Sequence, residues 1–184
     1  EKSYLTAVTH IDEQLVGIID VERIFAEIMN ITADVSEKLS TQCNASDKRM
    51  VLVADDSSVA RKQVTKTFEQ MSVECITANN GQEALDILVD WAEHHPERLQ
   101  ELSMVISDIE MPVMDGYTLT AEIRNHPQLK GIYVLLHSSL SGVFNQAMVK
   151  KVGADVFVPK FDSNELAQAF LDKVKPAEPR AVHA

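Results

Sequence analysis

Short apolar runs alternate with longer amphipathic segments along the chain from residue 50 onward. This alternation is typical of βα units, in which helices pack on both faces of a parallel sheet. The apolar runs contain few polar residues, as expected for strands that are buried on both faces. We therefore predict an α/β fold with five strand-and-helix units, (βα)5, around a doubly wound parallel sheet.

The expected strands are residues 50–54, 73–77, 104–107, 132–136 and 156–159. The expected helices span 58–71, a segment after Gly81 that ends before Pro96, 117–125, 142–152 and 163–174. The usual order of five such strands is 2-1-3-4-5, the flavodoxin-like order, with right-handed crossovers. This order is taken from the general rule for such folds, and it places a binding site at the carboxyl ends of the strands.

Composition excludes several classes of partner. The 184 residues include 17 Lys and Arg against 28 Asp and Glu, a net charge of −11, which repels nucleic acid and anionic lipid surfaces. The longest apolar runs are far shorter than the ~20 residues that a membrane-spanning helix needs. The two cysteines cannot form a metal site alone, and no secretory feature accompanies them. We expect a cytoplasmic protein with no nucleic-acid partner and no membrane insertion.

The residues before 50 follow a different pattern. Apolar residues at 4–9 and 15–19 flank a polar turn, and 21–28 has apolar residues at helical spacing. This pattern predicts a β-hairpin followed by a helix, a unit too small to bury its own apolar faces. The chain also starts without Met, so we expect part of this first domain to be missing. The predicted division is 1–31 for the remnant, 32–47 for a linker, 48–176 for the main domain and 177–184 for a tail.

Reactive side chains fall at the ends of the predicted strands. Asp55 and Asp56 follow the first strand, Asp108 follows the third, Ser138 lies close behind the fourth and Lys160 follows the fifth. Three carboxylates at one sheet edge repel one another unless a cation neutralises them, and hard oxygen ligands suit Mg²⁺. Asp108 could then attack phosphorus, while Ser138 and Lys160 bind the oxygens of the transferred group.

The segments Val51–Ser57, Val105–Gly116 and Gly153–Lys160 resemble the signature motifs of response-regulator receiver domains. The resemblance covers roughly residues 48–175. It implies that Asp108 is the phospho-acceptor and that Asp55 and Asp56 hold Mg²⁺ together with it. It also implies that the backbone carbonyl of Glu110 is a further metal ligand.

The same resemblance assigns roles on the other side of the acceptor. It implies that the Ser138 hydroxyl and Lys160 contact the phosphoryl group, and that Phe157 changes rotamer when Ser138 moves. Glu110 and Leu140 would flank the phosphoryl group and tune its lifetime. One departure is Phe161, which stands where the family usually has proline. His137 is a second unusual feature, because an apolar residue is commoner there.

The N-terminal segments Tyr4–Val8 and Leu15–Ile24 resemble the last hairpin and helix of CheW-like coupling domains. A coupling domain followed by a receiver is the domain order of the CheV family. The two resemblances imply a chemotaxis adaptor that is phosphorylated by a CheA-like histidine kinase and acts with chemoreceptors, either by modulating receptor–kinase coupling or as a phosphate sink.

Two alternatives stay open. A Mg²⁺-dependent phosphatase could use the same acceptor as an aspartyl-phosphate intermediate, with Glu110 as the candidate acid or base. A receiver could instead carry residues 1–47 as a dimerisation arm.

Overall fold

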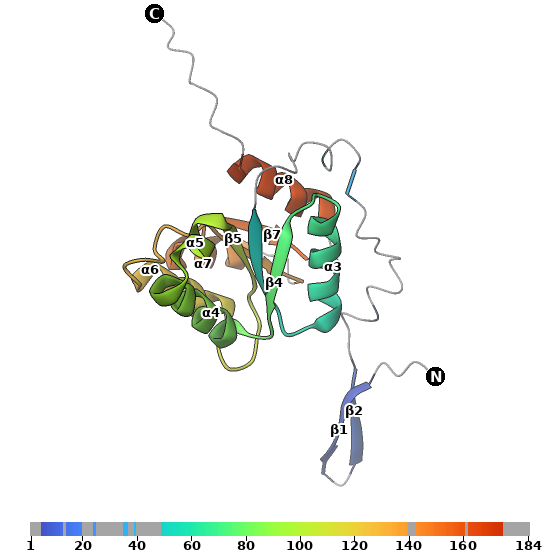
Figure 1. The fold of residues 1–184 in the computed structure, drawn as a ribbon. Helices are drawn as coiled ribbons and strands as arrows, with labels where there is room; N and C mark the ends of the chain where they lie inside the picture. The colour runs from blue at the N-terminus through green and yellow to red at the C-terminus, as the bar shows by residue number, and fades with distance from the viewer. Residues whose placement is uncertain are drawn as a thin grey trace, which may run out of the picture.

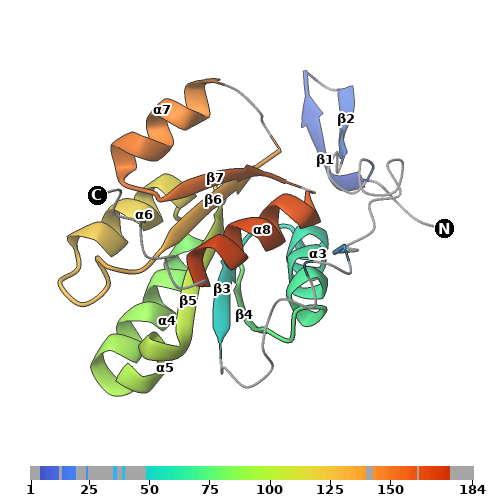
Figure 2. The ribbon, with the colours of Figure 1, turned by 90° about the horizontal axis from the view of Figure 1, so that it is seen from above.

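The computed structural model describes residues 5–12, 14–19, 24, 35–36, 39, 49–139, 143–160 and 162–174. Its main body is a five-stranded parallel sheet with helices on both faces (Figure 1, Figure 2). The strands are β3 (Met50–Ala54), β4 (Glu74–Ala78), β5 (Leu102–Asp108), β6 (Val134–Ser138) and β7 (Val156–Pro159). The helices are α3 (Ser58–Glu69), α4 (Gly81–His94), α5 (Pro96–Glu101), α6 (Gly116–Asn125), α7 (Val143–Val152) and α8 (Ser163–Val174).

The strand order across the sheet is β4-β3-β5-β6-β7, with every neighbouring pair parallel. Numbered along these five units, this is the predicted order 2-1-3-4-5, so the prediction of a flavodoxin-like (βα)5 fold is confirmed. Because all five strands point the same way, the residues that follow them gather at one edge of the sheet.

Two apolar cores form on the two faces of the sheet. One core contains buried residues of α4, α6 and α7, and the other contains buried residues of α3 and α8. Successive strand residues alternate between the faces: Leu52 belongs to the first core, and Val51 and Val53 belong to the second. This alternation decides which side chains at the strand ends can meet.

Some element boundaries differ from the predicted ones. The helix predicted to end before Pro96 does end at His94, but a further short helix, α5, starts at Pro96. Proline is tolerated in the first turn of a helix because the N–H that it lacks has no partner there. Asp108 and Ser138 are the last residues of β5 and β6 and do not follow the strands as predicted.

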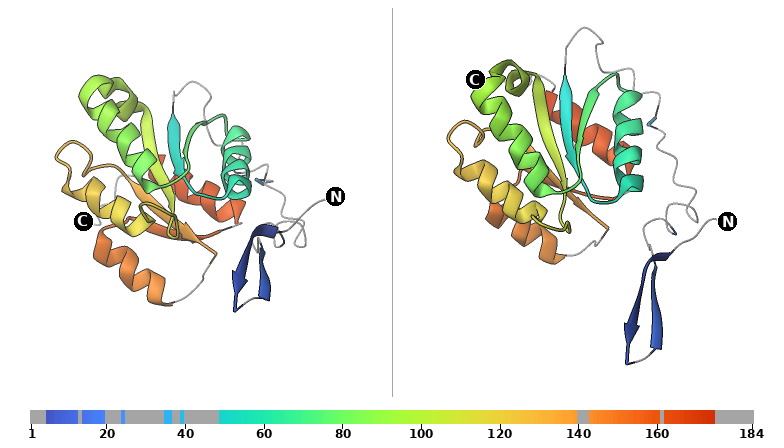
Figure 3. Two further views of the ribbon diagram at one scale, coloured as in Figure 1. Left: turned by 90° about the horizontal axis from the view of Figure 1, so that it is seen from below. Right: turned by 60° about the horizontal axis from the view of Figure 1, so that its bottom comes forward.

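The N-terminal hairpin is present as β1 (Leu5–Ile11) and β2 (Gln14–Ile19), paired antiparallel. It stands apart from the five-stranded sheet in both views of Figure 3. Six of its large apolar side chains are 49–69% exposed. The helix predicted after it and most of the predicted linker lie outside the described residues. No helix in the described ranges is both long enough and apolar enough to span a membrane.

Candidate functional site

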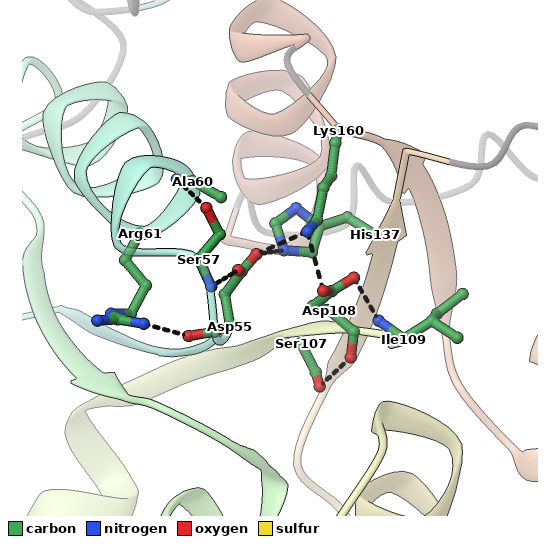
Figure 4. A network of polar contacts seen from close by, with 9 residues as sticks. All are labelled: Asp55, Ser57, Ala60, Arg61, Ser107, Asp108, Ile109, His137 and Lys160. Carbon is green, nitrogen blue, oxygen red and sulfur yellow. Dashed lines mark hydrogen bonds and ion pairs between the residues drawn. The ribbon is translucent and has the colours of Figure 1, made fainter. Parts of the chain in front are cut away.

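Four side chains from four neighbouring strand ends meet on the α3/α8 side of the sheet (Figure 4). Asp55 directly follows β3, Asp108 and His137 lie at the ends of β5 and β6, and Lys160 directly follows β7. The residues two positions before them all belong to the α3/α8 core: Val53, Ile106, Leu135 and Val158. The period of two along a strand therefore carries all four side chains to one face.

Lys160 connects the two buried carboxylates. Its Nζ lies 2.9 Å from Asp108 Oδ2 and 3.1 Å from Asp55 Oδ2. The three side chains are at most 5% exposed. On the far side of Asp55, the Nε2 of His137 lies 3.3 Å from the same Oδ2 atom. The arrangement is a row of alternating partners, His137–Asp55–Lys160–Asp108.

Backbone groups fix the other oxygen of each buried carboxylate. The N–H of Ile109 donates to Asp108 Oδ1 at 2.7 Å, and the N–H of Ser57 donates to Asp55 Oδ1 at 2.8 Å. Arg61, on the first turns of α3, donates to the Asp55 carbonyl. These bonds leave the carboxylates little rotational freedom, so the site is organised before any ligand arrives.

Asp55, Asp56 and Asp108 form an acidic cluster in which one oxygen of each lies within 4.8 Å of the others. Asp56 is exposed, whereas the other two are buried. Asp55 Oδ2 is buried and has no well-aligned hydrogen bond among the described residues. A buried carboxylate oxygen beside two more carboxylates is a donor set that suits Mg²⁺, so the residues present fit this ion.

Burial is the main cause that raises the pKa of Asp108 from 3.8 to about 6; the Lys160 charge opposes the rise, and the Asp55 charge adds to it. Burial also disfavours ionised Asp55, but the close approach of His137 and Lys160 holds the pKa of Asp55 below its usual value. The two adjacent carboxylates therefore have different pKa values, and it is the ionised form of Asp108 that the folded protein disfavours.

The structure places the other predicted residues around this cluster. Ser138 is buried at the end of β6, and Glu110 is exposed two residues after Asp108. Phe157 is partly buried against the core on the α4/α6/α7 side. Leu140 and Phe161, with the Lys160–Phe161 peptide bond, lie outside the described residues.

Gly116, the last residue of the Val105–Gly116 motif, has a packing role that the motif alone does not reveal. Its N–H donates to the Ile109 carbonyl at 3.0 Å, and a Cβ at this position would collide with the carbonyl oxygen of Asp108. Asp115 accepts from the N–H of Thr118 and caps α6. Glycine here lets α6 start directly against the backbone of the predicted acceptor.

The loop between Asp108 and α6 holds a strained residue. The N–H of Met114 donates to the Pro112 carbonyl at 2.8 Å, which closes a three-residue turn around Val113. Val113 has a φ of 69°, an uncommon value for a β-branched side chain, and is 84% exposed.

Comparison with known proteins identifies the class. Residues 51–171 match the model of the response regulator receiver domain family. This match covers well over half of the chain, which therefore belongs to the response regulator receiver family.

The particular relatives include chemotaxis proteins. The chain is 28% identical over 169 residues to chemotaxis protein CheV2 of Helicobacter pylori, covering 90% of this chain and 52% of the relative. It is 34% identical over 125 residues to protein PilG of Pseudomonas aeruginosa, covering 67% of this chain and 86% of PilG. The chain spans about half the length of the CheV relatives that it matches.

Solved structures agree with the fold. The CheX–CheY–BeF3–Mg complex from Borrelia burgdorferi matches with a TM-score of 0.59 and 28% identity, covering 70% of this chain and 90% of that chain. The Mg²⁺-complexed receiver domain of the histidine kinase CKI1 from Arabidopsis thaliana matches with a TM-score of 0.60 and 27% identity, covering 67% and 90%. The predictions of a receiver fold and of a likeness to CheV proteins are thus confirmed.

Proposed function

We propose that this chain is a chemotaxis signalling protein whose Asp108 accepts a phosphoryl group from a CheA-like histidine kinase. The carrying observation is the placement of Lys160 Nζ 2.9 Å from one oxygen of Asp108, beside a cluster of two further carboxylates. An ammonium group at this distance can pair with the carboxylate before phosphorylation and with the phosphoryl oxygens after it.

In the proposed step, an oxygen of ionised Asp108 attacks the phosphorus of a phosphohistidine, and the P–N bond breaks. The electron pair of that bond stays on the imidazole nitrogen of the kinase, so the product is an aspartyl phosphate with no external oxidant or reductant. Lys160 Nζ and the Ser138 hydroxyl would donate to the oxygens of the transferred group. The Ile109 N–H holds the remaining Asp108 oxygen in place.

Asp55, Asp56, Asp108 and the backbone carbonyl of Glu110 would hold Mg²⁺. When bound, the ion supplies positive charge that offsets the carboxylates and the incoming phosphoryl oxygens. Phe157 is proposed to repack when Ser138 moves toward the phosphoryl group, since it is partly buried at the neighbouring strand β7. Glu110 and Leu140 are proposed to tune the lifetime of the adduct.

The N-terminal hairpin is proposed to belong to a CheW-like coupling segment. The match to CheV2 extends over 169 residues, far more than the 121 residues of the receiver match, and therefore includes residues outside the receiver. The coupling role, the chemoreceptor partner and the cytoplasmic location follow from this likeness as proposals. Phosphorylation would then alter receptor–kinase coupling or draw phosphate from other regulators.

Incubation with Mg²⁺ and acetyl phosphate separates this function from that of a phosphatase. We expect one phosphoryl group per chain and slow release of inorganic phosphate, with neither seen in Asp108→Asn. Rapid multiple turnover of small phosphate esters without a detectable adduct would instead establish the phosphatase alternative.

A sedimentation experiment separates the coupling segment from a dimerisation arm. We expect the full chain without its coupling partners to sediment as a monomer at micromolar concentration. A tight homodimer that dissociates when residues 1–30 are deleted would favour the arm, and it would leave the proposed role of Asp108 intact.

A further inference from the structure

Part of the predicted linker is seated on the receiver. Val35 is only 8% exposed and belongs to the α3/α8 core, and Leu39 packs against the same core. The N–H of Val35 donates to Gln70 Oε1 at 3.0 Å, and the N–H of Ser36 donates to Asn164 Oδ1 at 3.0 Å. We call Val35, Ser36 and Leu39 the linker anchor.

The linker anchor bridges two helices that are far apart in sequence. Gln70 directly follows α3, and Asn164 lies in the first turn of α8. Beneath this bridge, the hydroxyl groups of Thr67 and Ser163 lie 3.2 Å apart in a buried hydrogen bond. The anchor therefore contacts both helices where α3 and α8 meet.

A second bridge joins the same two helices at the functional site. Asp55 stands three residues before α3, and Lys160 stands three residues before α8. The 3.1 Å ion pair between them ties together the turns from which the helices start. The linker anchor and the Asp55–Lys160 pair thus hold one helix pair at two places.

We propose that the α3–α8 junction is a docking surface for the linker anchor and that a phosphoryl group on Asp108 weakens this docking. The inference rests on the proposed function of Asp108. A phosphoryl group adds negative charge beside Lys160 Nζ and draws it from Asp55, which loosens the tie between the starts of α3 and α8. The anchor needs both helices in register, because Gln70 and Asn164 accept its two N–H groups.

Through this docking, a change at the functional site can affect the N-terminal side of the chain. The hairpin β1–β2 precedes the anchor in the chain, so release of the anchor would remove its nearest attachment to α8 among the described residues. Coupling between two sites is reciprocal for binding free energies. Release of the anchor by mutation must therefore favour the phosphorylated state.

Hydrogen exchange at the Val35 and Ser36 amides tests the proposal directly, because these amides donate the two docking bonds. We expect both amides of the full chain to exchange at least about tenfold slower than in an unfolded chain. With Mg²⁺ and beryllofluoride, a phosphoryl analogue, we expect exchange to accelerate at least about threefold. Absence of protection overturns the docking, and equal protection in the two states overturns the release.

Fluorine NMR of bound beryllofluoride distinguishes a failure of the proposed release from a failure of the proposed function. If the analogue binds and the amides keep their protection, the release is wrong and the proposed role of Asp108 stands. If no analogue binds to the full chain, both the proposed function and the proposed release of the anchor are wrong. The Asp108→Asn variant, which lacks the acceptor carboxylate, should show the resting protection in both buffers.

Substitutions at Asn164 test the reciprocal effect. Asn164→Leu removes the acceptor for the Ser36 N–H, so we expect lost protection and at least about twofold tighter beryllofluoride binding. Asn164→Asp keeps an acceptor and should retain the wild-type affinity and protection. Glu165→Leu changes an exposed neighbour in the same helical turn and serves as the matched control. Unchanged or weaker beryllofluoride binding by Asn164→Leu would contradict the coupling.

Discussion

At the scale of single residues, the site is a compact set of buried charges whose members need one another. Lys160 stands between Asp55 and Asp108, and each carboxylate has one oxygen held by a backbone N–H. A buried charge that loses its partner is costly, whereas a neutral replacement can be tolerated. The stability of the resting protein should therefore respond strongly to substitutions that change the charge balance.

Asp108→Asn should stabilise the Mg²⁺-free protein above pH 6. The pKa of Asp108 is raised to about 6, so the folded state binds this proton more tightly than the unfolded chain does. The free energy of unfolding therefore falls as the pH rises from about 4 to about 6, by about 3 kcal/mol from this group. Urea unfolding of both proteins at pH 4 and pH 8 checks this: the variant should be the more stable only at pH 8. Equal stabilities at pH 8 would contradict the account.

Lys160→Met should destabilise the Mg²⁺-free protein at pH 8 by about 3–5 kcal/mol, because it leaves two buried carboxylates without their cation. The same substitution in the Asp108→Asn background should cost less, since one of the two carboxylates is then neutral. A double-mutant cycle from urea unfolding measures this difference. Additive effects of the two substitutions would show that Lys160 and Asp108 are not coupled.

At the scale of elements, the start of α6 depends on the absence of a side chain at Gly116. Gly116→Ala should displace the backbone of Asp108 or of α6, because the added Cβ meets the Asp108 carbonyl. We expect a loss of about 1–3 kcal/mol in stability, typical of overpacking, and slower phosphorylation. Gly131→Ala is the control, since a Cβ there meets nothing within 4 Å. Wild-type behaviour of both variants, in unfolding and acetyl phosphate assays, would refute the packing argument.

The apolar runs were sufficient to predict all five strands of the main sheet, because strands buried on both faces leave little room for polar residues. The strand ends likewise predicted where Asp55, Asp108 and Lys160 would lie. For His137, the sequence indicates only that a histidine is unusual at this position, and it does not predict the contact with Asp55. This contact depends on which face each strand presents at its end, which follows from the register between strands.

Other features could not be read from local pattern. Helix α5 was missed because Pro96 was interpreted as the end of a helix, although it begins one. The packing role of Gly116 could not be predicted, because the close approach of the Asp108 carbonyl is a tertiary contact. Val35 lies in a mostly polar stretch, and its burial depends on a core to which two helices distant in sequence contribute.

At the scale of the whole molecule, the hairpin β1–β2 contrasts with the well-packed sheet. Six of its large apolar side chains are about half exposed or more: Leu5, Val8, Ile11, Leu15, Ile18 and Ile19. A surface of this kind indicates contact with further protein. The chain spans about half the length of the CheV relatives, and in our proposal the exposed apolar face belongs to a CheW-like coupling segment.

Val8→Lys and Leu15→Lys should leave the receiver unaffected. Both side chains are more than 50% exposed, so we expect changes below about 0.5 kcal/mol in the free energy of unfolding. Thermal unfolding followed by circular dichroism checks this, with phosphorylation by acetyl phosphate as the functional readout. A marked drop in the stability of the receiver would mean that the hairpin is part of its core.

Locating the phosphoryl group tests the central claim most directly. The full chain is treated with Mg²⁺ and acetyl phosphate, and the adduct is counted by intact-mass spectrometry and assigned to a residue by peptide mapping. The account predicts one phosphoryl group per chain, on the peptide that contains Asp108, and none in Asp108→Asn. An adduct at another residue, or an equal adduct in Asp108→Asn, would contradict it.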